Sequence, residues 1–269
     1  MRAIGVNTLH DYFGISIEEN LRLIKSAGFD CVFSSFTRKF PLKNAISAAK
    51  KLNLEYETLH APFGRCGLEQ NLNSMWLEND CGEEYLRLLF ECVGACAQNG
   101  IEKCVIHNAV TENPPPVSEI GLERFNRLFL YAKSCGVRMA VENLESEEHL
   151  RQLMELTGDF HGFCWDCGHN LCYTPMTDIM SLYGKKLICT HVDDNKGVTR
   201  PGIIHYTDDL HHMPFDGNLN WDWYSEKIRE CGYTGPLTLE LKDDYLGIGT
   251  EKFYEQAYKR AFKLCEMCM

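Results

Sequence analysis

Residues 103–143 read KCVIHNAVTENPPPVSEIGLERFNRLFLYAKSCGVRMAVEN, and this stretch decides the fold. It begins with an apolar run rich in β-branched residues, Lys103–His107, and ends with a second such run, Arg138–Asn143. Between them, Leu122–Ala132 spaces its apolar residues as one face of a helix does. Strands that are apolar throughout, joined by an amphipathic helix, are typical of a parallel sheet covered on both faces. The stretch therefore predicts one strand–helix–strand unit.

The same alternation runs through the whole chain. Eight runs predict strands: Ala3–Val6, Cys31–Ser34, Glu55–His60, Lys103–His107, Arg138–Asn143, His161–Asp166, Leu187–Val192 and Pro236–Leu241. Helical patterns follow them: Ile17–Ala27, Leu42–Leu52, Glu84–Ala97, Leu122–Ala132, Glu147–Leu156, Asp178–Tyr183, Trp221–Cys231 and Glu251–Leu264. Eight such units in 269 residues predict a single domain, residues 1–269, folded as a closed (β/α)8 (TIM) barrel. Periodicity alone leaves an open doubly wound sheet as the rival.

Composition limits the classes of protein. The chain has 45% apolar residues and a net charge of −11, which is typical of a globular protein and disfavours nucleic-acid or membrane-surface binding. No apolar run is long enough to cross a bilayer, and the start, MRAIGVNTLHDYFG, does not resemble a signal peptide. Most of the 14 cysteines lie in apolar runs, so we expect reduced thiols and a cytoplasmic protein. We interpret the zinc-like spacing of Cys164-x-x-Cys167 and Cys265-x-x-Cys268 as incidental.

Six consecutive predicted strands end in metal-binding residue types. In a barrel, the carboxyl ends of all strands meet at one mouth. The residues are His60, His107, Glu142, Asp166 with His169, His191 and Glu240. One such residue is commonly solvated, but six beside apolar strands need a neutralising charge. Imidazoles mixed with carboxylates favour zinc, manganese or cobalt over calcium, so the pattern predicts a metal site, with a purely structural cluster as the alternative.

Two long connections, residues 61–82 and 193–220, are expected to cover the mouth, since long loops in compact domains are commonly functional. The second contains Asp209-x-His211, whose spacing can place both side chains on one side of an extended segment. This pair is a candidate for additional metal or substrate binding, or simply part of a polar loop. Candidate apolar walls are Phe63, Trp76, Trp165 and Phe215, and core packing explains Trp165 equally well. His10, His149, His161 and His205 are interpreted as ordinary histidines.

The chain resembles the xylose isomerase-like TIM barrels, in particular the sugar phosphate isomerase/epimerase group, which is related to endonuclease IV. The resemblance spans the whole chain. It rests on HAPF, VENL, WDCGH, His191-x-x-Asp194-Asn195-x-Gly197, Asp209-x-His211-x-x-Pro214-x-x-Gly217 and Trp221. The resemblance implies one divalent metal ion (manganese, cobalt, zinc or magnesium) held by Glu142, Asp166, His191 and Glu240. It further implies that His169 binds the substrate and that His60 and His107 line the pocket.

The resemblance also implies an activity on a small sugar or sugar phosphate, with Glu142 and Glu240 as proton-transfer groups. A metal that polarises a ketose carbonyl acidifies the adjacent C–H and stabilises an enediolate. Two carboxylates then move protons, giving epimerisation or aldose–ketose isomerisation. Ketose 3-epimerases of this superfamily carry an Arg where this chain has Gly197, so Lys196 is only a weak candidate for substrate binding. Relatives often form homo-oligomers, which we expect here by analogy.

Other functions remain open on the same barrel. Endonuclease IV holds three zinc ions with nine residues, and this chain has candidates for all nine: His60, His107, Glu142, Asp166, His169, His191, Asp209, His211 and Glu240. A DNA-repair enzyme also needs basic loops, whereas this mouth contains Asp193, Asp194, Asp208 and Asp209, which disfavours nucleic acid as a partner. A metal-dependent polyol dehydratase or lyase is a further alternative. A barrel that binds a sugar without activity is a non-enzymatic one.

Overall fold

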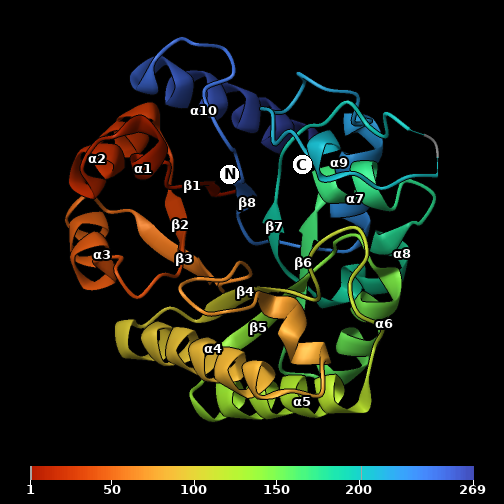
Figure 1. Ribbon diagram of the computed structural model, residues 1–269. Coiled ribbons are helices and arrows are strands. Elements are labelled where there is room, and N and C mark those ends of the chain that lie inside the picture. The colour runs from red at the N-terminus through yellow and green to blue at the C-terminus, as the bar shows by residue number, and fades with distance from the viewer. Residues whose placement is uncertain (1, 201) are drawn as a thin grey trace.

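The computed structural model describes residues 2–200 and 202–269, and within them eight parallel strands form one sheet surrounded by helices (Figure 1). The strands are β1 (Ile4–Asn7), β2 (Cys31–Ser35), β3 (Glu55–His60), β4 (Lys103–His107), β5 (Arg138–Glu142), β6 (Gly162–Asp166), β7 (Leu187–His191) and β8 (Leu237–Leu239). The helices are α1 (His10–Phe13), α2 (Ile17–Ala27), α3 (Leu42–Lys51), α4 (Asp80–Asn99), α5 (Glu119–Ser134), α6 (Glu147–Leu156), α7 (Cys167–Tyr173), α8 (Ile179–Tyr183), α9 (Trp221–Glu230) and α10 (Thr250–Met267). Short 3-10 turns are η1 (Leu72–Trp76), η2 (Gly184–Lys186) and η3 (Tyr206–Asp208).

The sheet closes on itself between its two outer strands. Its strand order is β7-β6-β5-β4-β3-β2-β1-β8, so closure requires β7 to meet β8. Val192, directly after β7, forms a parallel bridge with Leu239. The Val192 amide donates to the Thr238 carbonyl at 2.9 Å, and the Glu240 amide donates to the Val192 carbonyl at 3.2 Å. The predicted (β/α)8 barrel is therefore confirmed, and the open doubly wound sheet is wrong.

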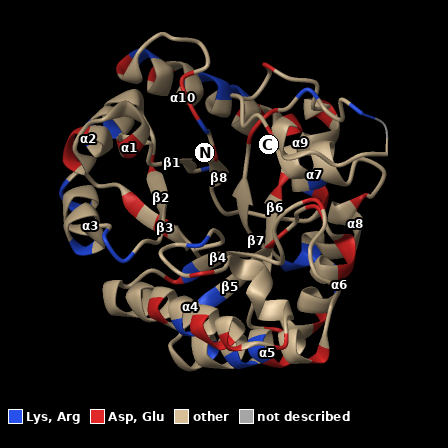
Figure 2. Ribbon diagram, viewed as in Figure 1, with Lys and Arg blue, Asp and Glu red and all other residues tan. Residues whose placement is uncertain are grey.

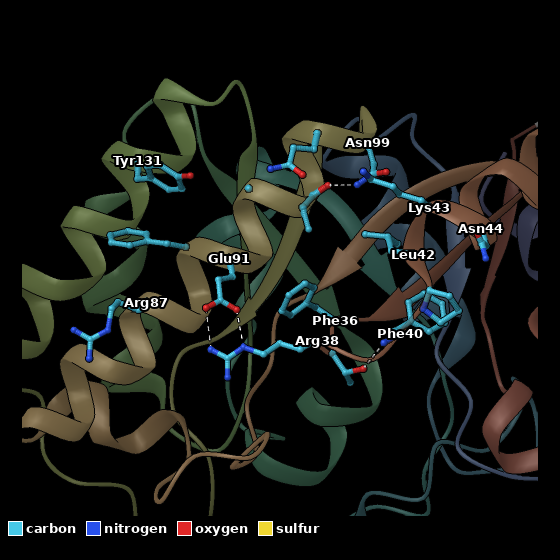
Figure 3. Close-up of a pocket in the computed structure, with 16 residues that line it drawn as sticks. Phe36, Arg38, Phe40, Leu42, Lys43, Asn44, Arg87, Glu91, Asn99 and Tyr131 are labelled. Atoms are coloured by element: carbon cyan, nitrogen blue, oxygen red, sulfur yellow. Dashed lines mark hydrogen bonds and ion pairs between the residues drawn. The ribbon is translucent and has the colours of Figure 1, made fainter.

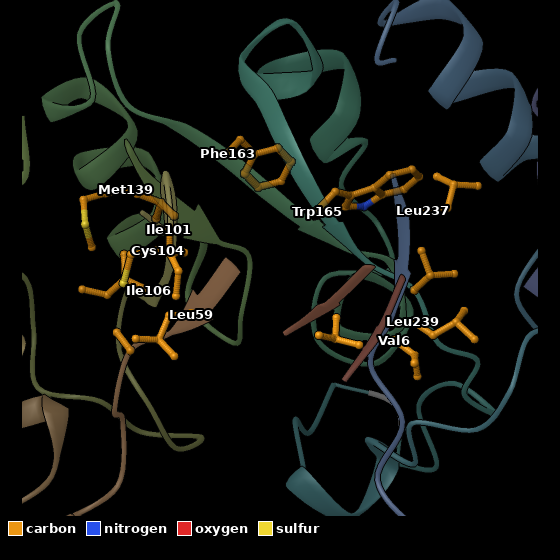
Figure 4. Close-up of a cluster of buried hydrophobic side chains, with 14 of the residues drawn as sticks. Val6, Leu59, Ile101, Cys104, Ile106, Met139, Phe163, Trp165, Leu237 and Leu239 are labelled. Carbon is orange, nitrogen blue, oxygen red and sulfur yellow. The ribbon is translucent and has the colours of Figure 1, made fainter. Parts of the chain in front are cut away.

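The strands are apolar on both sides because each contributes to two separate cores. Outward-facing residues pack against the surrounding helices in the larger core, as Figure 4 shows for Cys104, Ile106 and Phe163. Inward-facing residues fill the barrel with a smaller cluster made of Val105, Ala140, Cys164 and Cys189. Successive strand residues point to opposite faces, so neighbours in sequence serve different cores.

Below that inner cluster, a buried ion pair occupies the amino-terminal end of the barrel. Lys103 Nζ lies 2.9 Å from Glu57 Oε1, and Thr238 donates its hydroxyl proton to the other Glu57 oxygen. Glu57 and Lys103 come from the adjacent strands β3 and β4. Buried charged groups are stable only when they are paired, as Glu57 and Lys103 are here. Their side chains fill this end of the barrel interior, and the open mouth lies at the other end.

The sequence patterns did not predict two short helices, α1 and α7. All but one residue of α7 are buried, so it has no polar face and no amphipathic pattern. Its N-cap is Asp166, whose carboxylate accepts the His169 amide at 2.6 Å. The last residue of β6 thus also starts the next helix, which holds His169 at the mouth.

All 14 cysteines are free thiols in the structure. Within the described residues, neither Cys-x-x-Cys pair belongs to a group of converging ligand atoms. In the same part of the chain, no helix has both the length and the apolar character needed to cross a membrane.

The close contact between α5 and η1 predicts that the stability of the protein depends strongly on Gly121. A Cβ added at Gly121 would lie 2.1 Å from Cε3 of the buried Trp76 ring. We expect Gly121→Ala to lower the free energy of unfolding by about 1–3 kcal/mol, because overpacked cores must shift. Gly94→Ala in α4 is the matched control, since its Cβ would meet only Tyr131 Oη, at 3.6 Å. It should stabilise the protein by about 0.5–1 kcal/mol. Urea unfolding of both variants checks this, and equal effects would contradict it.

Candidate metal centre and active site

The barrel brings the nine predicted site residues together at its mouth. They are His60, His107, Glu142, Asp166, His169, His191, Asp209, His211 and Glu240. Six of them end a strand or follow it directly, as expected from the position of each strand in the barrel. Eight of the nine have ligand atoms in overlapping groups in which all atoms lie within 4.8 Å of one another, and the ninth, His107, contacts Glu142 Oε2 at 3.3 Å.

The first donor group consists of Glu142, Asp166, His191 and Glu240. His191 Nδ1 lies 3.0 Å from Glu142 Oε1 and 2.9 Å from Glu240 Oε2, so the imidazole bridges the two carboxylates. These three residues come from β5, β7 and the end of β8. The first group is the one that the family resemblance implies for a single metal ion.

Strong mutual interactions set the charge of the first donor group. Burial alone would raise the pKa of Glu142, but the charges of His191 and His107 hold it well below its usual value. Burial also opposes ionisation of Glu240, whose pKa His191 nevertheless lowers to about 2. Burial would lower the pKa of His191, but Glu240 and Glu142 raise it well above its usual value. The two glutamates are therefore carboxylates at neutral pH.

Asp166 differs from the two glutamates. Burial raises its pKa to about 7, together with the charges of Glu142 and Glu240 and against the charge of His169. One oxygen caps α7, whereas the other, Oδ2, is buried and has no hydrogen-bond partner within the described structure. An additional positive charge beside Oδ2 would hold Asp166 in its ionised form.

Glu142 is surrounded by imidazoles. Its Oε2 lies 3.2 Å from His60 Nε2 and 3.3 Å from His107 Nε2. Its Oε1 lies 3.0 Å from His191 Nδ1 and 3.4 Å from His169 Nδ1. Its side chain is fully buried, whereas that of Glu240 is 19% exposed. Only Glu240 of the two glutamates therefore reaches the open pocket.

A second donor group lies beside the first and consists of His169, Asp209 and His211. Asp209 Oδ2 lies 2.8 Å from His211 Nε2 and 3.5 Å from His169 Nε2. The Asp209-x-His211 pair thus belongs to the site and is more than a polar loop. A third group joins Asp166 of the first to His211 of the second through Asp193.

Asp193 and Asn195 are site residues that sequence reasoning did not single out as functional. Asp193 is fully buried, and its Oδ2 lies 3.3 Å from His211 Nδ1. The Asn195 amide nitrogen donates to Asp193 Oδ1 at 3.1 Å and to Asp209 Oδ1 at 3.3 Å. Its oxygen accepts the His211 amide at 3.1 Å, where His211 has a positive φ of 47°. Asn195 thus supports a backbone conformation at His211 that residues other than glycine rarely adopt.

The open part of the site is a cavity of about 590 Å³ at the mouth. Its lining includes Phe63, Tyr173, Tyr206, Glu112, Glu145 and Lys242, together with His107, His169, Asp209, His211 and Glu240. The two long loops contribute Phe63, Tyr206, Asp209 and His211, so both help to enclose the cavity as predicted. Phe63 also stacks on His107, with ring centroids 4.4 Å apart.

Other candidates from the sequence lie elsewhere. Lys196 is exposed and is not part of the cavity lining. Trp76 and Trp165 are buried in the core, and Phe215 packs on Trp221, so Phe63 alone of the four proposed aromatic walls faces the cavity. Among the remaining histidines, His161 accepts the Met139 amide, which is an ordinary structural role.

A larger hollow of about 820 Å³ lies outside the barrel, between the start of α3 and the side of α4 (Figure 3). The ion pair between Arg38 and Glu91, with Nε–Oε2 at 2.7 Å, spans it, and Phe36, Phe40 and Phe90 line it. It contains none of the nine site residues.

In Figure 2 the acidic and basic residues lie largely on the helices around the barrel.

The fold agrees with comparisons to known proteins. The family model described as xylose isomerase-like TIM barrel matches residues 21–265. The chain belongs to this family. Uncharacterized protein y4fM of Sinorhizobium fredii is 26% identical over 294 residues, covering 95% of this chain and 91% of that protein.

Solved structures share this xylose isomerase-like fold. L-ribulose 3-epimerase superposes with a TM-score of 0.73 at 13% identity, covering 100% of this chain and 94% of that one. The IolI protein, solved with a bound zinc atom, superposes with a TM-score of 0.74 at 17% identity, covering 100% and 98%. At these identities the likeness establishes the common fold.

The residues of this xylose isomerase-like barrel fit a divalent cation. Three carboxylates and one imidazole in the first group are ligands that suit zinc, manganese or cobalt. Asp166 Oδ2 and Asp193 Oδ2 are buried without hydrogen-bond partners in the described residues. Buried polar oxygens of this kind are costly, and a cation between them and the histidines would satisfy them.

The same barrel has no room for a side chain between α7 and the loop after β7. A Cβ at Gly168 would lie 1.8 Å from Asp193 Oδ1 and 2.5 Å from Asn195 Nδ2. We expect Gly168→Ala to displace both residues and to weaken divalent-metal affinity by about 10–100-fold, the effect typical of disturbed supporting contacts. Gly64→Ala is the control, because its Cβ meets nothing within 4 Å. Equal metal affinity in the two variants, measured by titration, would contradict the expectation.

Proposed function

We propose that the chain is a metal-dependent isomerase or epimerase of a small sugar or sugar phosphate. The observation that carries the proposal is the position of Glu240, an ionised carboxylate that belongs to the first donor group and also faces the cavity. A cavity of about 590 Å³ with aromatic and polar walls suits a ligand of monosaccharide size. Membership of the xylose isomerase-like family and the epimerases among its structural neighbours support the same function.

The proposed chemistry divides between the metal and the side chains. A bound divalent cation would polarise the carbonyl and hydroxyl oxygens of a ketose and acidify the neighbouring C–H. Glu240, which lines the cavity, is proposed to remove that proton. Glu142, covered by four imidazoles, is proposed as a ligand and as the second proton-transfer group, acting through the histidines that contact it. His169 and His107 line the cavity and can bind substrate hydroxyls.

The second donor group favours one alternative function. His169, Asp209 and His211 could hold a further ion, and several ions together suit hydrolysis of a phosphodiester. The cavity wall argues against a polyanion, since Lys242 is its one Lys or Arg among the described residues, beside Glu112 and Glu145. Dehydration of a polyol uses the same base and is a further outcome of the test.

The test begins with the metal content of protein purified without a metal-affinity tag. One ion per chain is expected, and three zinc ions would instead favour the phosphodiesterase. The loaded protein is then incubated in D2O with a panel of ketoses and ketose phosphates. Deuterium at the carbon next to the carbonyl, detected by NMR, is the expected result. Failure of every divalent ion to bind would overturn the proposal. Sugar binding without deuterium exchange or turnover would also overturn it and would leave a sugar-binding barrel.

A further inference from the structure

Three cysteines meet on the outer side of the barrel wall. Cys92 and Cys96 lie one helical turn apart on α4, so both face the same neighbour. Cys104 on β4 belongs to the same outer core as these two cysteines. Figure 4 shows its sulfur atom among apolar residues of that core. All three side chains are completely buried.

The sulfur atoms are close enough to share one ion. All three lie within 4.8 Å of one another, and Cys92 Sγ and Cys104 Sγ are 3.7 Å apart. With bonds of about 2.3 Å and bond angles of roughly 90–110°, two sulfurs bound to one ion are separated by about 3.3–3.8 Å. A disulfide sulfur pair would be much closer, at about 2.05 Å. The 3.7 Å between Cys92 Sγ and Cys104 Sγ is thus too long for a disulfide and fits both a thiol–thiol hydrogen bond and two sulfurs bound to one ion.

The cluster is separate from the site at the mouth. Cys104 is the second residue of β4, whereas His107, which faces the cavity, is the last. In the described residues, no histidine or carboxylate joins the three thiols, so an ion there would have sulfur ligands alone. Thiolates are soft ligands, which select thiophilic ions and not the manganese or magnesium suited to carboxylates.

The charge of three thiolates also limits which ions can bind at the cluster. Three thiolates around a divalent ion would leave a net negative charge in an apolar core, which is costly. A trivalent ion leaves the site neutral. We propose that Cys92, Cys96 and Cys104 form a three-coordinate site for a trivalent thiophilic ion, with arsenite as the probe. Arsenite, As(OH)3, would exchange its three hydroxyls for three As–S bonds, releasing three waters without any change in oxidation state.

Arsenic binding to reduced protein tests the proposal directly. One equivalent of sodium arsenite is added to native protein, and in parallel during refolding from guanidinium, and unbound arsenite is then removed. We expect one retained arsenic per chain, with three sulfur neighbours in its X-ray absorption spectrum. Cadmium, a divalent comparator, should be retained less well at the cysteines, as judged by its thiolate charge-transfer absorption. This readout is independent of activity and of the nitrogen and oxygen ligands at the mouth.

Variants identify the ligands. Cys96→Ser and Cys96→Ala should each reduce arsenic retention at least tenfold, and using both separates ligand loss from a folding defect, which circular dichroism would detect. Cys164→Ser is the matched control, because Cys164 is another fully buried thiol and belongs to the barrel interior. Its arsenic retention should equal that of the wild type. Three results would overturn the proposal: no retained arsenic by either route, fewer than three sulfur neighbours, or retention unaffected by both Cys96 variants. Cadmium binding at the cysteines without arsenite binding would overturn it as well.

Discussion

Glu240→Gln is expected to reduce turnover by about 10²–10⁴-fold, the usual contribution of a positioned proton-transfer group. The amide keeps the size of the side chain but cannot accept a proton from carbon. Glu240 is only partly buried at the base of the cavity, so the fold should tolerate the change. The measurement is the rate of deuterium incorporation or product formation with a ketose that the wild type accepts, at saturating metal.

Glu145→Gln is the matched control for Glu240→Gln. Glu145 also lines the cavity but belongs to neither donor group, so its removal should change kcat by less than about tenfold, even if KM rises. Metal occupancy of each variant is measured in parallel, because the amide introduced by Glu240→Gln is a poorer ligand than a carboxylate. Wild-type kcat in Glu240→Gln at full occupancy would show that another group moves the proton.

Metal binding is expected to raise Tm, and Asp166→Asn should abolish most of that rise. At a metal concentration about 100 times Kd, binding adds about 2.7 kcal/mol of stability. For a chain of this size, that corresponds to a rise in Tm of roughly 5–10 °C. Asp166 Oδ2 is buried without a partner among the described residues, and a neutral amide there would be a far weaker ligand. Calorimetry with and without manganese, cobalt or zinc measures the effect.

Asp194→Asn is the control that separates metal binding from general stability. Asp194 is equally buried, but its oxygens accept the Leu219 amide and the Trp221 indole proton, so its role is structural. This variant should lower Tm in both states and keep the metal-induced rise. A full metal-induced rise in Asp166→Asn would remove Asp166 from the ligand set.

The strand ends are the part of the site that local sequence could predict. Glu142 and His191 each close an apolar run, and in a barrel the ends of such runs meet at one mouth. Helix α7 could not be predicted, because its burial on all sides removes the polar face that marks a helix. The role of Asn195 was hidden for a different reason, since its partners Asp209 and His211 lie in a loop 14 and 16 residues further along the chain.

The sequence by itself determined the repeated strand–helix unit and the chemical types of residue at the strand ends, because these follow from periodicity and from residues directly at strand ends. Closure of the sheet into a barrel was decided by the tertiary structure, where Val192 after β7 pairs with Leu239 of β8. Tertiary structure alone decided that Glu240 faces the cavity while Glu142 lies beneath four imidazoles. It also decided that Phe63, and neither Trp76 nor Trp165, lines the pocket. These outcomes depend on side-chain direction and on contacts between segments far apart in the chain, which no local pattern records.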